Sequence, residues 1–132
     1  MAKVFNRDVE VFGDVTVSGA AKPATLTLTD TGTATASSGA ATLSTKTGVV
    51  TTESLTTAQN AIYTLTLTNT KIAATSVVLV SVGNGTNTQG TPMLGAVTPA
   101  AGSCVIKVIN KHATSEALNG TLKIAFAVID VA

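Results

Sequence analysis

The stretch AIYTLTLTNT, residues 61–70, alternates large apolar and hydroxyl side chains. Tyr63, Leu65 and Leu67 fall on one side of an extended chain, and the threonines between them fall on the other. A period of two is the period of a strand, so the stretch predicts a strand with one buried face. The same period recurs in CVIKVIN, residues 104–110, and in NGTLKIAFAVIDV, residues 119–131. No stretch of the chain has a sustained helical period.

The segments between these stretches predict how the strands are arranged. Residues 76–82, SVVLVSV, are apolar on both faces, which predicts a central strand buried on both sides. Asn84-Gly85 and Asn119-Gly120 are dipeptides typical of type I′ turns. Several short strands separated by Gly, Asn and Pro indicate an all-β fold, either a sandwich or a small barrel. We expect an antiparallel, jelly-roll-like β-sandwich.

The N-terminal third of the chain has too few large apolar side chains to build a core. Within residues 18–47 the bulky apolar side chains are Leu26, Leu28 and Leu43. We therefore expect a boundary near Thr47. Residues 1–47 are predicted to form an N-terminal arm with short strands and a linker, and residues 48–132 the C-terminal β-sandwich domain.

The arm contains a second threonine-rich stretch, TLTLTDTGTATA, at residues 25–36. Threonine favours strands, and its hydroxyl can pair across strands without charge repulsion. The stretch lacks the dense apolar sequence that follows residues 61–70. We expect it to form a strand that becomes ordered through neighbouring subunits.

The charge content limits the partners of the protein. Charged residues make up 11% of the chain, the formal net charge is +1, and the lysines are scattered. The chain therefore has no basic patch for nucleic acid or an anionic membrane, and no run approaches the roughly 20 apolar residues of a membrane span. The N-terminus has no signal-peptide pattern, which predicts a cytosol-like environment. We expect so weakly charged a surface to be covered by copies of the chain or by a larger assembly, the alternative being a monomer made soluble by its hydroxyl groups.

Residues that could carry out chemistry are sparse. His112 is the only histidine, and without a G-x-S-x-G motif we expect it to cap a backbone group or to face water. Cys104 lies in a strand-like run, where a small buried hydrophobic residue is expected. Asp8, Glu10 and Asp14 could bind calcium weakly, although a solvated strand face is favoured. We expect no catalytic site, no metal site and no cofactor, and hence a structural or interaction protein rather than an enzyme.

Three stretches of the chain together resemble a group of small β-rich virion proteins of tailed bacteriophages. They are GVVTTESLTTAQNAIYTLTLTNT from residue 48, TSVVLVSVGNGTNTQGTP from residue 75 and VTPAAGSCVIKVINKHATSEALNGTLKIAFAVI from residue 97. Proteins of this kind occur as capsid decoration or cement proteins, commonly trimeric knobs over local threefold axes of the shell. They also occur as the globular ends of tail or head fibres.

The resemblance implies a trimeric capsid decoration protein that stabilises the shell from its outer surface after being made in the host cytoplasm. Its partners would be the major capsid protein and its own copies, with no nucleic acid, membrane or cofactor. The candidates for contact with the shell are Val9, Val11, Phe12, Val15, Val17, Leu26 and Leu28. The alternative is a fibre tip that binds a host receptor, for which the chain has few aromatic side chains. A short arm suits a cement protein better than a fibre that must span distance.

Overall fold

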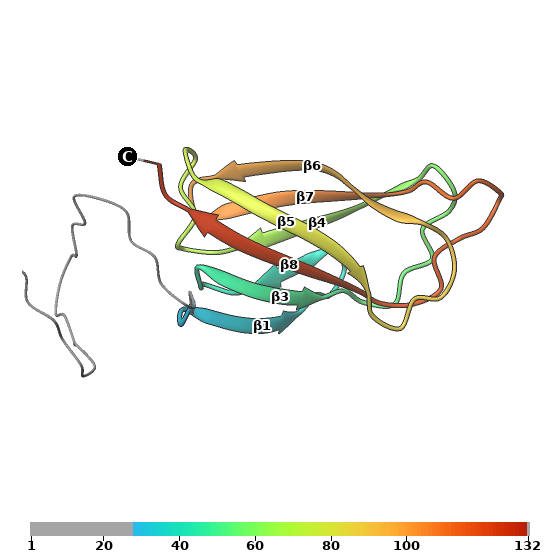
Figure 1. Cartoon of the computed structure of the whole chain (residues 1–132), viewed down its shortest axis with the longest axis horizontal. Helices are drawn as coiled ribbons and strands as arrows, with labels where there is room; N and C mark the ends of the chain where they lie inside the picture. The colour runs from blue at the N-terminus through green and yellow to red at the C-terminus, as the bar shows by residue number, and fades with distance from the viewer. Residues whose placement is uncertain (1–27, 132) are drawn as a thin grey trace, which may run out of the picture.

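A computed structural model describes residues 28–131, and these residues form an all-β fold (Figure 1). The strands are β1 (Thr31–Thr35), β2 (Ala40–Thr42), β3 (Thr47–Thr51), β4 (Ile62–Thr68), β5 (Val77–Asn84), β6 (Pro92–Ala100), β7 (Ser103–Asn110) and β8 (Leu122–Ile129). They form two four-stranded sheets, sheet A in the order β1-β3-β8-β5 and sheet B in the order β2-β4-β7-β6. The predicted β-sandwich is therefore confirmed. In the described range, no helix is long and apolar enough to span a membrane.

The pairing within the sheets is mixed rather than purely antiparallel. β1 pairs with β3, and β2 pairs with β4, in parallel, whereas the other neighbours are antiparallel. The first four strands alternate between the two sheets. Along the sequence, the two strands of each parallel pair are therefore separated by one strand of the opposite sheet. That strand brings the chain back to the end of the sandwich at which the first strand of the pair began.

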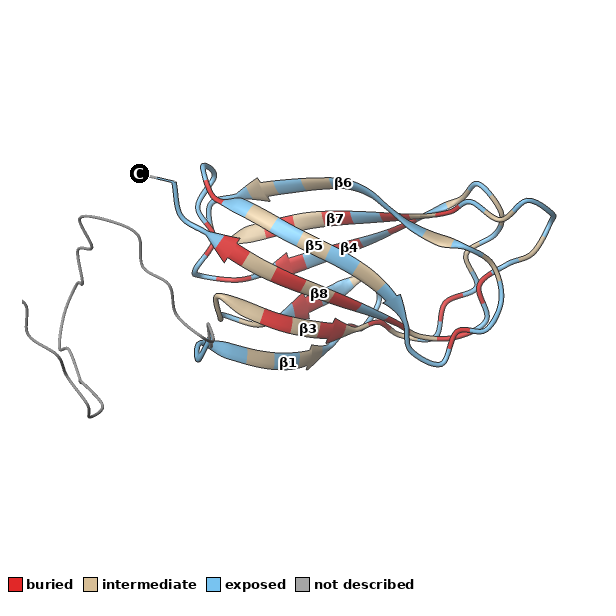
Figure 2. Ribbon diagram, in the orientation of Figure 1, coloured by how far each residue is buried: buried red, intermediate tan, exposed pale blue. Residues whose placement is uncertain are grey.

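The core lies between the sheets and contains the apolar rows that the sequence predicted (Figure 2). The inward side chains of the three longest apolar rows are Tyr63, Leu65 and Leu67 on β4, Cys104, Ile106 and Val108 on β7, and Leu122, Ile124, Phe126 and Val128 on β8. The alternating residues on these strands, such as Thr64 and Lys107, are exposed. Side-chain direction alternates along a strand, so the period of two in the sequence was sufficient to assign these faces.

The sandwich begins upstream of the expected boundary at Thr47. β1 and β2 form edge strands of sheets A and B, and Ala36 and Ala41 are buried in the core. The expectation rested on the scarcity of bulky side chains, but these edge strands are held by backbone pairing and fill the core with alanine. Residues 31–35 of the threonine-rich stretch pair with β3 of the same chain, so they need no neighbouring subunit for order. Residues 25–27 lie outside the described range.

The Asn-Gly dipeptides also differ from expectation. A type I′ turn needs positive φ at both central residues, and none of Asn84, Gly85, Asn119 and Gly120 has it. These glycines instead allow two loops to approach closely. A Cβ on Gly85 would lie 2.4 Å from Thr121 Oγ1, and one on Gly120 would lie 2.7 Å from the backbone of the facing loop.

The turn with positive φ at two consecutive residues is Ser38-Gly39, between β1 and β2, with φ of 51° and 73°. It is held by Glu53, whose Oε1 accepts a hydrogen bond from the Gly39 N–H at 2.8 Å. The other carboxylate oxygen of Glu53 accepts a hydrogen bond from the Tyr63 hydroxyl at 3.0 Å. Gly39 also packs tightly, because a Cβ there would lie 2.6 Å from the Thr64 carbonyl oxygen. One carboxylate thus ties the turn between the sheets to the core.

Replacing Gly39 by alanine tests this close packing. We expect Gly39→Ala to lower the free energy of unfolding by about 2–4 kcal/mol, because it combines strain at positive φ with a backbone clash. Gly102→Ala is the matched control, since Gly102 has a φ of 78° and nothing within 4 Å of the added Cβ. The control should cost only the strain, about 1 kcal/mol. Equal losses in urea denaturation would contradict the packing argument.

The Tyr63 hydroxyl predicts a dependence of stability on alkaline pH. Burial, followed by the hydrogen bond to Glu53 and its negative charge, raises the pKa of Tyr63 well above its ordinary value. A raised pKa favours the neutral phenol in the folded state, so its contribution is complete below about pH 10 and is lost as the pH rises further. Above pH 10 we expect the unfolding free energy of Tyr63→Phe to fall less steeply than that of the native chain, by at most about 1.4 kcal/mol per pH unit. Lysines also titrate in this pH range, but both proteins contain the same lysines. Parallel plots of unfolding free energy against pH would therefore refute the contribution assigned to the Tyr63 hydroxyl.

Candidate interaction surface

β5 was predicted to be a central strand buried on both sides, and this prediction is wrong. Among residues 28–131, β5 is an edge strand of sheet A and pairs only with β8. Its outward side chains Val77 and Leu79 are 45% and 56% exposed. A sequence that is apolar on both faces is typical of a strand covered on both sides. It does not say whether the cover comes from the same chain.

The outer face of sheet A around β5 is apolar and uncharged. The register places Val77 beside Ile129, Leu79 beside Ala127, and Ser81 beside Ala125. Ile129 is itself 48% exposed. We call this surface the apolar face; its residues are Val49, Val77, Leu79, Ser81, Ala125, Ala127 and Ile129.

Charged groups lie at the two ends of the apolar face rather than within it. The ion pair between Lys46 and Asp130 marks the end where β5 begins. Lys123, opposite Gly83, marks the end where β5 finishes. Between these ends a partner could be bound without desolvating a charge, which favours burial against another protein surface.

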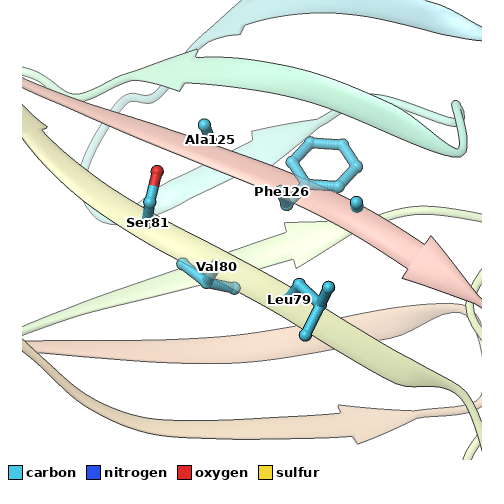
Figure 3. A pocket seen from close by; sticks show the side chains of 6 residues that line it. Leu79, Val80, Ser81, Ala125 and Phe126 are labelled. Atoms are coloured by element: carbon cyan, nitrogen blue, oxygen red, sulfur yellow. The ribbon is translucent and has the colours of Figure 1, made fainter. Parts of the chain in front are cut away.

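A shallow hollow lies between β5 and β8 (Figure 3). The side chains around it come from these two strands, and the only polar one is Ser81. Small-molecule sites are usually deep clefts with several converging polar groups. The hollow therefore suits an apolar side chain of a protein partner better than a substrate.

A smaller apolar row lies on the outer face of sheet B. Ile62 of β4, Ile109 of β7 and Met93 of β6 are adjacent in register. Ile62 and Met93 are exposed, and Ile109 is half-buried. This row is narrower than the apolar face and lies beside Lys107, so it is the weaker candidate for a large interface.

His112 does not simply cap a backbone group or face water as expected. Its Nδ1 lies 3.0 Å from the Thr91 hydroxyl, and its Nε2 lies 2.8 Å from Glu116 Oε2. A hydroxyl, an imidazole and a carboxylate are linked in the order of a catalytic triad, but the roles of the two ring nitrogens are exchanged, because in the triad Nε2 faces the hydroxyl and Nδ1 the carboxylate. In addition, the N–H groups of Gly90 and Thr91 already donate to Glu116 Oε2 at 3.4 Å and to Asn110 Oδ1 at 2.9 Å, so neither is free to bind an oxyanion beside Thr91. The contacts of His112 with Thr91 and Glu116 instead connect the 111–121 loop to the loop before β6.

The remaining sequence candidates have the following positions. Cys104 is fully buried, as predicted, and burial raises the pKa of its thiol. Leu28 is 56% exposed and available for a contact. The other shell-contact candidates and the proposed calcium ligands lie outside the described residues; they are Val9, Val11, Phe12, Val15, Val17, Leu26, Asp8, Glu10 and Asp14. Within residues 28–131 no three His, Cys, Asp or Glu side chains are grouped to hold a metal ion.

The chain matches no protein family, no curated protein and no solved structure. Its resemblance to virion proteins of tailed phages therefore stays a prediction from the sequence. The apolar face was not recognised from the sequence, although SVVLVSV contained the signal. A strand buried in a sheet and a strand covered by a partner have the same apolar pattern, so only the strand order distinguishes them.

A charge placed in the apolar face should prevent self-association. We expect Leu79→Glu to remain folded, because the side chain is already exposed, but to reduce self-association at least tenfold in analytical ultracentrifugation. Thr64→Glu is the matched control: Thr64 is exposed on the outer face of sheet B, opposite Lys107. If both variants associate like the native chain, the apolar face is not an interface between copies.

Proposed function

We propose that the protein is a virion structural protein of a tailed bacteriophage, a trimeric decoration protein that binds over the major capsid protein shell. The observation that carries the proposal is the uncharged apolar face on the outside of sheet A, with Val77, Leu79 and Ile129 all about half exposed. Burying such large apolar side chains stabilises an assembly by roughly 25 cal/mol per Å², whereas leaving them in water promotes aggregation. The resemblance of residues 48–131 to phage virion proteins supports the same role.

In this proposal the N-terminal segment contacts the shell from one end of the sandwich. Asp30 lies at one end of the sandwich, where its side chain accepts a hydrogen bond from the Lys46 N–H at 3.0 Å. The segment before Leu28 therefore joins the sandwich at that end. Leu28 is exposed there and belongs to the shell-contact candidates. In this arrangement the apolar face is left free for neighbouring copies.

The alternative function is a fibre tip that binds a host receptor, and one observation favours it. The loops at the opposite end of the sandwich are joined by hydrogen bonds of the buried Asn87 and Asn110 (Figure 1). Asn110 bonds to Thr57 and Glu116 carbonyl oxygens at 3.0 and 2.7 Å, and Asn87 accepts a bond from the Asn119 N–H at 2.9 Å. Loops that are already hydrogen-bonded to one another are suited to recognition, because less conformational entropy is lost when they bind a partner.

Two measurements test the decoration role. Light scattering should give a mass three times that of the 13.1 kDa subunit, and added protein should sediment with phage shells. Imaging of intact particles should show density over threefold positions of the head. A stable monomer that does not bind shells would refute the proposal, and density on the tail together with binding to host cells would favour the fibre tip.

Deleting residues 1–22 tests the role of the N-terminal segment. We expect the truncated protein to lose shell binding by at least tenfold while retaining a folded sandwich, because β1 to β8 all lie after this segment. Co-sedimentation with shells measures binding, and circular dichroism measures folding. Full decoration by the truncated protein would show that the shell contact lies elsewhere.

A further inference from the structure

The four edge strands of the sandwich differ in how they resist pairing with another strand. β1 and β2 are short, with five and three residues. β6 has Pro92 and Pro99 and a register shift between Leu94 and Val97, and each of these features disfavours a further strand. β5 has eight residues, VVLVSVGN, with no proline, no charge and an unbroken register. Of the described edges, β5 alone is long, regular and apolar.

The free side of β5 lacks hydrogen-bond partners among residues 28–131. The strand pairs with β8 on one side, and no backbone or side-chain hydrogen bond reaches its main chain from the other. Ser76 and Gly85, which flank it, do find partners, in Ala73 and Thr121. A long edge with open N–H and C=O groups is a template for an added strand.

The core is also incompletely covered along this edge. Val78, Val80 and Val82 point toward the core from β5 but are only partly buried. On β6, which lies beside β5 in the opposite sheet, Leu94 is 39% exposed. An added strand with apolar side chains on one face would cover this strip.

We propose that residues 8–17 of this chain pair along β5 as an additional antiparallel strand. The described chain starts at the end of the sandwich where β5 begins, because Asp30 bonds to Lys46, and Lys46 pairs with Asp130 beside the first residues of β5. β5 runs away from this end, so a segment that lies along β5 and ends near Asp30 would run in the opposite direction. Pairing between them would then be antiparallel, the more stable arrangement.

The length of the intervening chain allows this pairing. Twelve residues, 18–29, separate the segment from Asp30 and span up to about 40 Å when extended. The distance from β1 across sheet A to β5 is three strand spacings, about 14 Å. The segment can therefore reach β5 of its own subunit or of an adjacent copy.

The side-chain pattern of the segment matches the uncovered strip. Val9, Val11, Val15 and Val17 all have odd numbers, so in a strand that continues through Gly13-Asp14 they would share one face and extend the row formed by Val78, Val80 and Val82. The opposite face presents Asp8, Glu10 and Asp14. Carboxylates on the outermost strand would oppose the addition of a further strand. β5 has no charged side chain and lacks this protection.

This inference does not need the virion role, although it refines the contacts assigned there. The four valines are buried against β5, while Phe12, Leu26 and Leu28 remain for the shell. The two competing occupants of β5 are the β5 strand of a second copy and a strand of the shell protein. Experiments on the purified chain alone distinguish the segment from these two competing occupants, and their results do not depend on shell binding.

Hydrogen exchange on the full chain tests whether the segment covers β5. In Val15→Asp the new charge lies on the face that packs against the valines, so we expect the free-edge amides of β5 to exchange at least tenfold faster than in the native chain. Thr16→Asp adds the same charge to the opposite face and should leave these amides protected. β1 amides serve as an internal control. Equal β5 exchange in the native chain and both variants would overturn the proposal.

Disulfide trapping tests which face the segment presents. Ser81→Cys lies on the outer face of β5, so under mild oxidation it should bond with a cysteine at an even position of the segment, Glu10→Cys or Phe12→Cys, and not at Val11→Cys. Thr64→Cys, on sheet B, is the matched control and should bond with none of them. A product of one-subunit or two-subunit mass supports the proposal, and shows whether the strand comes from the same chain or from its neighbour. Absence of the disulfide bond would overturn the proposal. Efficient dimerisation of the Ser81→Cys single variant would also overturn it, and would indicate that β5 strands of two copies pair with each other.

Discussion

The packing of the inward rows of β4, β7 and β8 is the contact on which the rest of the structure depends. Leu65, Ile106 and Ile124 are fully buried there, and they come from both sheets. Because Phe126 and Tyr63 are the only buried aromatic residues in the described part, most of the core area comes from aliphatic side chains. β4 and β7 form the centre of sheet B, and β8 lies between β3 and β5 in sheet A. Every other strand is positioned by pairing with one of these or with a neighbour of one.

The two ends of the sandwich and its β5 side differ in their polar and charged groups. At the loop end, Asn110, Asn87 and Asn119 bond to the main chain of neighbouring loops, so the buried polar groups are satisfied and the loops are held together. At the opposite end, charges gather around Lys46 and Asp130. Among the residues that the structure describes, the outer side of β5 has no charged side chain and no hydrogen bond at its free edge. Its outward apolar side chains Val77 and Leu79 are about half exposed.

Much of the fold could be predicted from the sequence because strand residues alternate sides regardless of their partners. The inward positions of Leu65, Ile106 and Phe126, and the burial of Cys104, followed from the period of two. The Asn-Gly turns were mispredicted, because dipeptide preferences cannot tell a tight hairpin from two loops that need glycine to approach each other. The contribution of β1 and β2 was underestimated, since backbone pairing with distant strands leaves no mark in side-chain composition.

By itself, the sequence determined an all-β chain with few charges and the faces of its longest strands. Those properties depend on residue type and local spacing. Only the tertiary structure decided that β5 lies at an edge, that Glu53 joins the Ser38-Gly39 turn to Tyr63, and that His112 meets Thr91 and Glu116. These features depend on which distant segments become neighbours. Strand order is set by the whole chain packing at once, and the apolar pattern of a strand is the same whether a sheet or a partner covers it.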